Sequence, residues 1–256
     1  MPNKADSNAF RQVGIENGSR SVDVHPPPGY RERPSEVPGA VVWTRDFALD
    51  AATAVLPDGC MDLLWIDGVL RVAGPDTRAY RPTVGPAVRI SGLRFYPGTA
   101  PALLGVPAHE LRDTRAELAD VLTPADARHA TDLIARAENP MRGLESVAHW
   151  LAAGTDPADP MLAHIVTHLR AGASVAATAD LLDLGPRRLH RISLTAFGYG
   201  PKTLARILRM QRALALARAG TPLAETAART GYADQAHLSR DIRDFAGTPI
   251  SRLLEP

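Results

Sequence analysis

The chain has 256 residues, of which 45% are hydrophobic and 22% charged, and its formal net charge at pH 7 is +1. These values are typical of a globular protein of two ordinary domains, and because no apolar run approaches the roughly 20 residues that span a bilayer, the sequence excludes a membrane protein. The single cysteine, Cys60, excludes an internal disulfide and a cysteine-rich zinc site, and the polar start of the chain lacks the apolar core of a secretion signal, so we expect a cytoplasmic protein.

The N-terminal part predicts a β-rich domain after a short tail. Residues 1–21 are polar and aperiodic, which predicts a disordered N-terminus. Beyond them, short apolar runs alternate with Pro, Gly and Asp turn signals. The expected strands are residues 40–44, 52–56, 61–66, 69–72, 88–90 and 92–96. Strands of this length and spacing predict an antiparallel barrel or sandwich, in which residues 61–66 form a buried central strand.

Helical patterns follow Pro107. Thr123 is an N-cap residue before a proline, and the helix from there to about residue 137 has one apolar face. A second amphipathic helix covers residues 141–153. Such helices either pack on the β domain or pair with a second subunit; we favour packing on the β domain and place the whole N-terminal domain at residues 22–153.

Residues 154–160 predict a linker, because they hold two prolines and two aspartates without an apolar anchor. The following domain, residues 161–256, is helical throughout and basic. From residue 157 onward there are 13 Lys and Arg residues against 8 Asp and Glu, whereas the preceding 156 residues hold 16 against 20. A basic C-terminal domain on a mildly acidic N-terminal one suits DNA binding.

Two segments of the C-terminal domain have the pattern of a helix-turn-helix. Residues 176–191 and 223–240 each predict a short helix, a tight turn with one glycine (Gly185 and Gly231) and a second helix rich in Arg or His. A long helix opening at Gly200 and Pro201 joins them. We therefore expect an α+β protein: a β-barrel or sandwich with two or three following helices, then an all-α domain of two helix-turn-helix subdomains bridged by a long helix.

The second helix of each unit has one apolar and one polar face. In the first unit, Leu189 and Ile192 are expected to face inward, while the outward set is Arg187, Arg188, His190 and Arg191. In the second unit the expected buried residues are Leu238, Ile242 and Phe245, and the outward ones are Gln235, His237 and Arg240. Arg pairs with guanine and Gln with adenine, at about 1–3 kcal/mol of discrimination per pair. Asp234 suits an N-cap, and Lys202 a phosphate contact.

Residues 160–256 resemble the C-terminal DNA-binding domain of AraC-type transcription regulators. The motifs that carry the resemblance are FGYGPKTLARILRMQRA at 197–213, GYADQAHLSR at 231–240 and FAGTP at 245–249. The resemblance implies two subdomains bridged by one long helix, with both recognition helices in successive major grooves of double-stranded DNA. It implies base readers at Arg187, His190, Arg191, Gln235, His237 and Arg240.

Two positions depart from the pattern of this family. Ala236 stands where a polar side chain often precedes His237, so that contact is absent or is made to a thymine methyl group. Ser193 replaces an aromatic residue in the first recognition helix, so we expect the first unit to pack more loosely than the second.

Residues 22–150 are similar to an uncharacterised variety of the β-rich, cupin-like sensor domain of the same family. The similar segments are LPDGCMDLLW at 56–65, AGPDT at 73–77 and RFYPG at 94–98. The similarity names no ligand, but it implies a domain that forms a homodimer and responds to a small-molecule effector, in a regulator that contacts RNA polymerase. Metal cupins use a His-x-His pair, and only His25 and His109 lie near this region, so we expect no metal and no cofactor.

A few residues of the β domain are candidates for an effector site. Asp58, Cys60, Asp62 and Arg94 are able to bind a polar effector; alternatively Asp58 begins a turn, Asp62 and Arg94 form a structural ion pair and Cys60 is packed. Trp43 and Trp65 either line an apolar pocket or belong to the core.

The sequence thus predicts a sequence-specific transcription regulator that is not an enzyme. Two alternatives stay open. One is an enzyme that repairs alkylated DNA through Cys60, although no Lys or nearby His promises a lowered thiol pKa. The other is a DNA-binding protein whose N-terminal domain binds only a protein partner.

Overall fold

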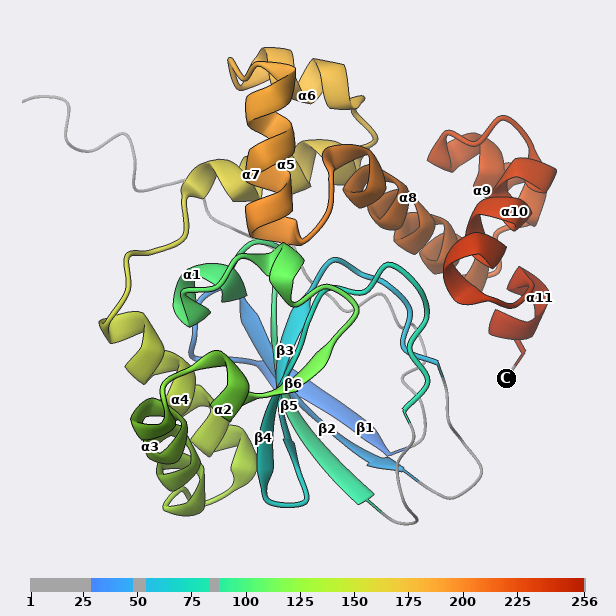
Figure 1. Ribbon diagram of the computed structural model, residues 1–256. Helices are drawn as coiled ribbons and strands as arrows, with labels where there is room; N and C mark the ends of the chain where they lie inside the picture. Colours follow the sequence, from blue (N-terminus) through green and yellow to red (C-terminus); the bar gives the residue numbers. More distant parts are fainter. Residues whose placement is uncertain (1–28, 48–53, 83–87, 256) are drawn as a thin grey trace, which may run out of the picture.

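The computed structural model describes residues 29–47, 54–82 and 88–255 (Figure 1). The predicted disordered segment 1–21 and the start of the predicted strand 52–56 lie outside the described residues. Of the helices in the described part, none is long and apolar enough to cross a membrane.

The described strands form one six-stranded antiparallel sheet in the order β1-β2-β5-β3-β4-β6. Their bounds are β1 Tyr30–Pro34, β2 Ala40–Phe47, β3 Met61–Ile66, β4 Val69–Ala73, β5 Val88–Phe95 and β6 Arg115–Glu117. The antiparallel prediction is confirmed, and β3 is central as expected. The two strands expected over residues 88–96 are one strand, β5, and the described part of segment 52–56 makes only an isolated bridge from Val55 to Tyr80.

Helices cover one face of this sheet. They are α1 Ala100–Leu104, the 3-10 helix η1 Ala108–Glu110, α2 Leu118–Val121, α3 Pro124–Ala135 and α4 Pro140–Ala153. The amphipathic α4 packs on β2, β3 and β5, and α3 packs on α4 (Figure 1). Because α4 buries its apolar face on the sheet and α3 packs against α4 in the same core, packing on the β domain is confirmed. The core between them holds Val42, Leu63, Leu93, Phe95, Leu144 and Val147, each at most 1% exposed.

The C-terminal part is helical throughout its described length. Its helices are α5 Pro160–Ala171, α6 Val175–Leu181, α7 Pro186–Phe197, α8 Pro201–Arg218, α9 Leu223–Thr230, α10 Gln235–Ala246 and α11 Ile250–Leu253. Three of these helices have side-chain caps: Asp159, Ser174 and Asp234 each accept a hydrogen bond from a backbone N–H of the first turn, as predicted for Asp234.

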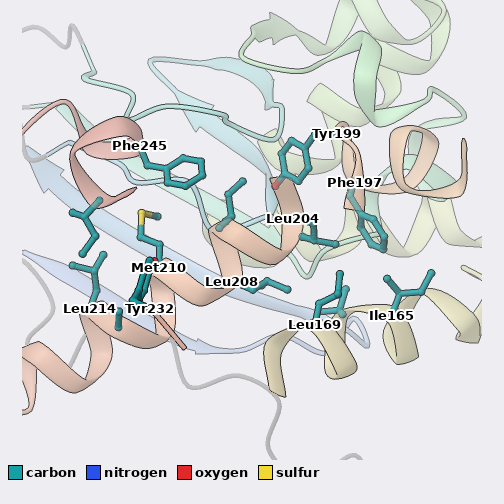
Figure 2. Close-up of a cluster of buried hydrophobic side chains, with 14 of the residues drawn as sticks. Ile165, Leu169, Phe197, Tyr199, Leu204, Leu208, Met210, Leu214, Tyr232 and Phe245 are labelled. Atoms are coloured by element: carbon teal, nitrogen blue, oxygen red, sulfur yellow. The ribbon is translucent and has the colours of Figure 1, made fainter. Parts of the chain in front are cut away.

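The long helix α8 lies at the centre of the C-terminal core. Figure 2 shows Leu204, Leu208 and Leu214 of α8 along one hydrophobic cluster. At one end of the cluster lie side chains of the first helix-turn-helix, and at the other end lie Tyr232 and Phe245 of the second. Both units therefore bury their apolar faces on a single helix and share one hydrophobic core.

A buried carboxylate ties β1 to the helical layer. Glu145 of α4 is 2% exposed and accepts two hydrogen bonds from Arg33, at 2.9 and 2.8 Å. It also accepts from the Ser35 hydroxyl at 3.0 Å and from the backbone N–H of Glu36 at 2.9 Å. Although burial opposes ionisation, these donors outweigh it and lower the pKa of Glu145 from 4.5 to about 2.

This site predicts a pH-dependent contribution to stability. Because the folded-state pKa of Glu145 is depressed, the contribution is complete above about pH 4.5 and is lost as the pH falls through about 2. We expect Glu145→Gln to lower the free energy of unfolding at pH 7 by about 1–3 kcal/mol, and to lower it less as the pH approaches 2. Urea denaturation at several pH values measures the loss at pH 7 and its change with pH. A loss that does not vary with pH would contradict the assignment.

Candidate functional site

The first helix-turn-helix consists of α6, a turn and α7. Gly185 lies in the turn as predicted, whereas the left-handed residue of the turn is Asp183, with φ of 50°. Gly185 has φ of −64° and is the N-cap of α7. In the second unit, by contrast, Gly231 has φ of 78° and ends α9 as predicted.

The predicted readers of the first unit lie together at the N-terminal half of α7. Leu189 is 1% exposed and anchors the helix, whereas the neighbouring cationic and imidazole side chains are exposed, namely Arg187, Arg188, His190 and Arg191. The His190 ring lies against Gly200, since a Cβ at that glycine would be 2.9 Å from its Cε1. Exposed Lys202 follows at the start of α8, so the polar groups extend beyond the helix.

The second unit places two of its three predicted readers in solvent. Gln235 and Arg240 of α10 are exposed, while Leu238 and Ile242 are completely buried. His237 differs from its predicted outward position because it is partly buried: its ring packs edge-on against Tyr232, with the ring centroids 5.1 Å apart. Its Nδ1 also accepts a 3.4 Å hydrogen bond from the backbone N–H of Ala233. The imidazole thus helps to hold the turn.

A buried carboxylate fastens the second recognition helix to α8. Asp241 of α10 is 4% exposed and accepts hydrogen bonds from Arg206 at 2.9 and 2.6 Å and from Arg209 at 3.3 Å. The Tyr232 hydroxyl donates a further bond at 2.9 Å. Sequence reasoning missed this residue, although an acidic side chain beside the apolar face of α10 and two arginines three positions apart on α8 were a usable signal.

The first recognition helix has no such fastening. Among the described residues, no ion pair joins α7 to α8. Ser193 of α7 is completely buried, and its hydroxyl has no hydrogen-bond partner. An unpaired buried hydroxyl costs about 1–3 kcal/mol, so Ser193 adds no polar contact that would hold α7 in its unit.

The N-terminal candidates gather on the sheet face opposite α4. Trp43 lies flat across Gly92, where a Cβ would be 2.2 Å from the indole ring, and its Nε1 donates a 2.8 Å hydrogen bond to Asp62. Arg94 pairs with Asp62 at 3.3 Å and with Asp58 at 3.6 Å. The predicted ion pair therefore exists, but it is part of a cluster of two carboxylates, a guanidinium and an indole.

Cys60 and Trp65 differ from the other candidate residues of the N-terminal domain. Burial, and then the negative charge of Asp58, raise the pKa of the Cys60 thiol well above its ordinary value, which disfavours a reactive thiolate. The backbone N–H of Cys60 donates to Asp58 in the predicted turn, at 2.8 Å. Trp65 points to the opposite face of the sheet from Trp43 and packs on the core under the helices, so the two indoles do not line one pocket.

Comparisons with known sequences match two parts of the chain. Residues 178–255 match a helix-turn-helix domain, and this C-terminal domain is of the AraC type. Residues 40–117 match a domain of unknown function, DUF6597. No curated protein matches the chain.

Among solved structures, the chain is similar to ToxT from Vibrio cholerae. One ToxT crystal structure is 10% identical, with 88% of this chain and 98% of that chain covered and a TM-score of 0.47. A second, of wild-type ToxT with an unsaturated fatty acid bound, is 13% identical, covers 84% of this chain and 94% of that chain, and has a TM-score of 0.45.

The Asp241 fastening predicts a large difference between two neighbouring carboxylates. We expect Asp241→Asn to lower the free energy of unfolding by roughly 2 kcal/mol, because Arg206 and Arg209 lose their buried counter-charge. Asp244→Asn is the matched control: Asp244 also faces Arg206, at 3.4 Å, but it is 69% exposed, so its loss should cost less than about 0.5 kcal/mol. Urea denaturation of both variants measures the difference, and equal losses would show that burial of Asp241 contributes nothing.

Proposed function

Because the chain carries an AraC-type helix-turn-helix domain at its C-terminus, we propose that it is a sequence-specific transcription regulator that reads two successive major grooves of DNA. One observation carries the proposal. The exposed donors of both recognition helices lie in the N-terminal halves of α7 and α10, while the apolar faces of both helices are buried on α8. A recognition helix contacts base edges with that half.

The proposed base readers are the exposed donors of the two helices. In the first unit they are Arg187, Arg188, His190 and Arg191, and in the second they are Gln235 and Arg240. Lys202 is proposed as a phosphate contact. His237 supports the second reader from the turn, and its role in reading is secondary because the ring already packs on Tyr232.

The N-terminal domain is proposed to sense a small polar effector at the cluster of Trp43, Asp58, Asp62 and Arg94. The partly exposed carboxylates of Asp58 and Asp62 and the guanidinium of Arg94 offer acceptors and donors to one polar ligand beside the buried indole of Trp43. The regulator would act in the cytoplasm as a homodimer and alter contact with RNA polymerase. Trp65 is left out of the proposed site because it packs on the opposite face of the sheet from Trp43. Cys60 is left out because burial raises the pKa of its thiol.

Single reader substitutions test base recognition. We expect Arg191→Ala and Arg240→Ala each to weaken the free energy of binding to the preferred DNA by about 1–3 kcal/mol and to relax the preference at one base pair. Each substitution removes a guanidinium group that can donate two hydrogen bonds to a base edge. Binding is measured on the preferred sequence and on each single-base variant of it. Equal weakening on preferred and random DNA would identify phosphate contacts in place of base contacts.

Lys202 tests a contact to the DNA phosphates, which does not depend on the base sequence. If its ammonium group neutralises a phosphate, Lys202→Ala weakens binding uniformly across sequences and makes the slope of log K against log salt concentration shallower by about one unit. Titrations at several salt concentrations measure the slope. An unchanged slope would place Lys202 outside the interface.

A further inference from the structure

One segment of the N-terminal domain touches both helix-turn-helix units. Residues 74–80, here called the strut, follow β4 directly. Pro75 of the strut packs on Gly198, which ends the first recognition helix, α7. The backbone N–H of Ala79 donates a 2.7 Å hydrogen bond to the carbonyl of Phe245, in the last turn of α10. The strut thus meets the C-terminal ends of both recognition helices.

The contact at Gly198 is too close for any other residue. A Cβ at this position would lie 2.4 Å from Cγ of Pro75 and 3.2 Å from the carbonyl oxygen of Ala108. Gly247 ends α10 in the same left-handed conformation, with φ of 66° against 83° for Gly198, yet nothing lies within 4 Å of a Cβ there. Helix termination requires glycine at both positions, but only Gly198 also permits docking of another part of the chain.

The N-terminal domain also satisfies carbonyl groups that the two helices leave unpaired. The last four carbonyls of a helix lack partners within it. Phe245 receives its donor from Ala79, and the carbonyl of Gly198 accepts a 3.3 Å hydrogen bond from Arg112. Both recognition helices are therefore held by their C-terminal ends, and their N-terminal halves point away from the N-terminal domain.

The strut is itself held firmly on the sheet. Asp76 forms a two-pronged pair with Arg115 of β6, at 2.9 and 2.6 Å, and the two side chains are only 11% and 16% exposed. The Arg115 guanidinium also lies 4.0 Å from the centre of the Tyr80 ring. Backbone hydrogen bonds of 2.8 and 2.9 Å join Tyr80 to Val55. Since both ends of the strut are fixed to the N-terminal domain, the strut holds Pro75 and Ala79 in defined positions against the two recognition helices.

We propose that the strut is a positioning element that sets the spacing and angle between the two recognition helices. The inference rests on the DNA reading proposed above. The strut matters most to α7, because Pro75 packs directly on the glycine that ends this helix and no ion pair joins α7 to α8 within the described residues. Pro75 and Ala79 act through the recognition helices and touch no DNA themselves.

A matched pair of glycine substitutions tests the strut. Gly198→Ala displaces Pro75, whereas Gly247→Ala imposes the same left-handed strain without a steric neighbour. Both full-length variants are titrated with DNA in which the distance between the two half-sites of the selected sequence is varied one base pair at a time. We expect Gly198→Ala to lose about tenfold in affinity at the preferred spacing and to discriminate less among spacings, whereas Gly247→Ala keeps the wild-type preference.

A second substitution separates positioning from local damage to α7. Pro75→Ala removes the Cγ atom that the added methyl group would meet, so the double variant Pro75→Ala, Gly198→Ala should recover part of the spacing preference. A defect confined to the end of α7 would not recover. Identical spacing profiles for Gly198→Ala, Gly247→Ala and wild type would overturn the inference. Absence of any preferred sequence for the wild type would instead refute the proposed function.

Discussion

The burial of two recognition helices on one helix, α8, is the constraint on which the rest of the structure depends. Leu204, Leu208 and Leu214 of α8 lie in a single cluster that takes side chains from the first unit at one end and from the second at the other. Since protein interiors are close-packed, neither unit can turn without disturbing the core that it shares with the other. Two separate helix-turn-helix domains on a flexible linker would have no such relation.

Within that shared core, the two units are held by different means. The second recognition helix is fastened by the buried Asp241 between two arginines of α8. The first has the unpaired hydroxyl of Ser193 in its core and packs on η1 and α1 of the N-terminal domain. With the positioning role proposed for the strut, this difference would give the N-terminal domain more influence over the first reader than over the second, which suits a domain proposed to sense an effector.

Local rules predicted much of this structure. The caps at Thr123 and Asp234 and the apolar spacing of Leu238, Ile242 and Phe245 were predicted correctly, because they depend only on neighbours along the chain. The edge strands β1 and β6 were missed because β1 is polar and β6 has three residues. Polar partnerships across long sequence distances, such as Asp241 with Arg206, were missed as well.

The candidate effector site also combines a part that local sequence patterns predict and a part that depends on contacts distant in sequence. Strand alternation already separates Asp62 from Trp65, because they are three positions apart in β3 and point to opposite faces. That Trp43 crosses Gly92 to reach Asp62 depends on the pairing of β2, β5 and β3, which no local pattern specifies. Likewise, the docking of Pro75 on Gly198 required the packing of the two domains.

The pair of readers held on α8 is best tested by selecting binding sites from random DNA with the full-length protein and footprinting the selected sequence. We expect two protected segments on one face of the DNA, with centres about 10 base pairs apart for each copy of the chain. A single protected segment, or two whose spacing varies freely among selected sequences, would contradict a pair of readers held on one helix.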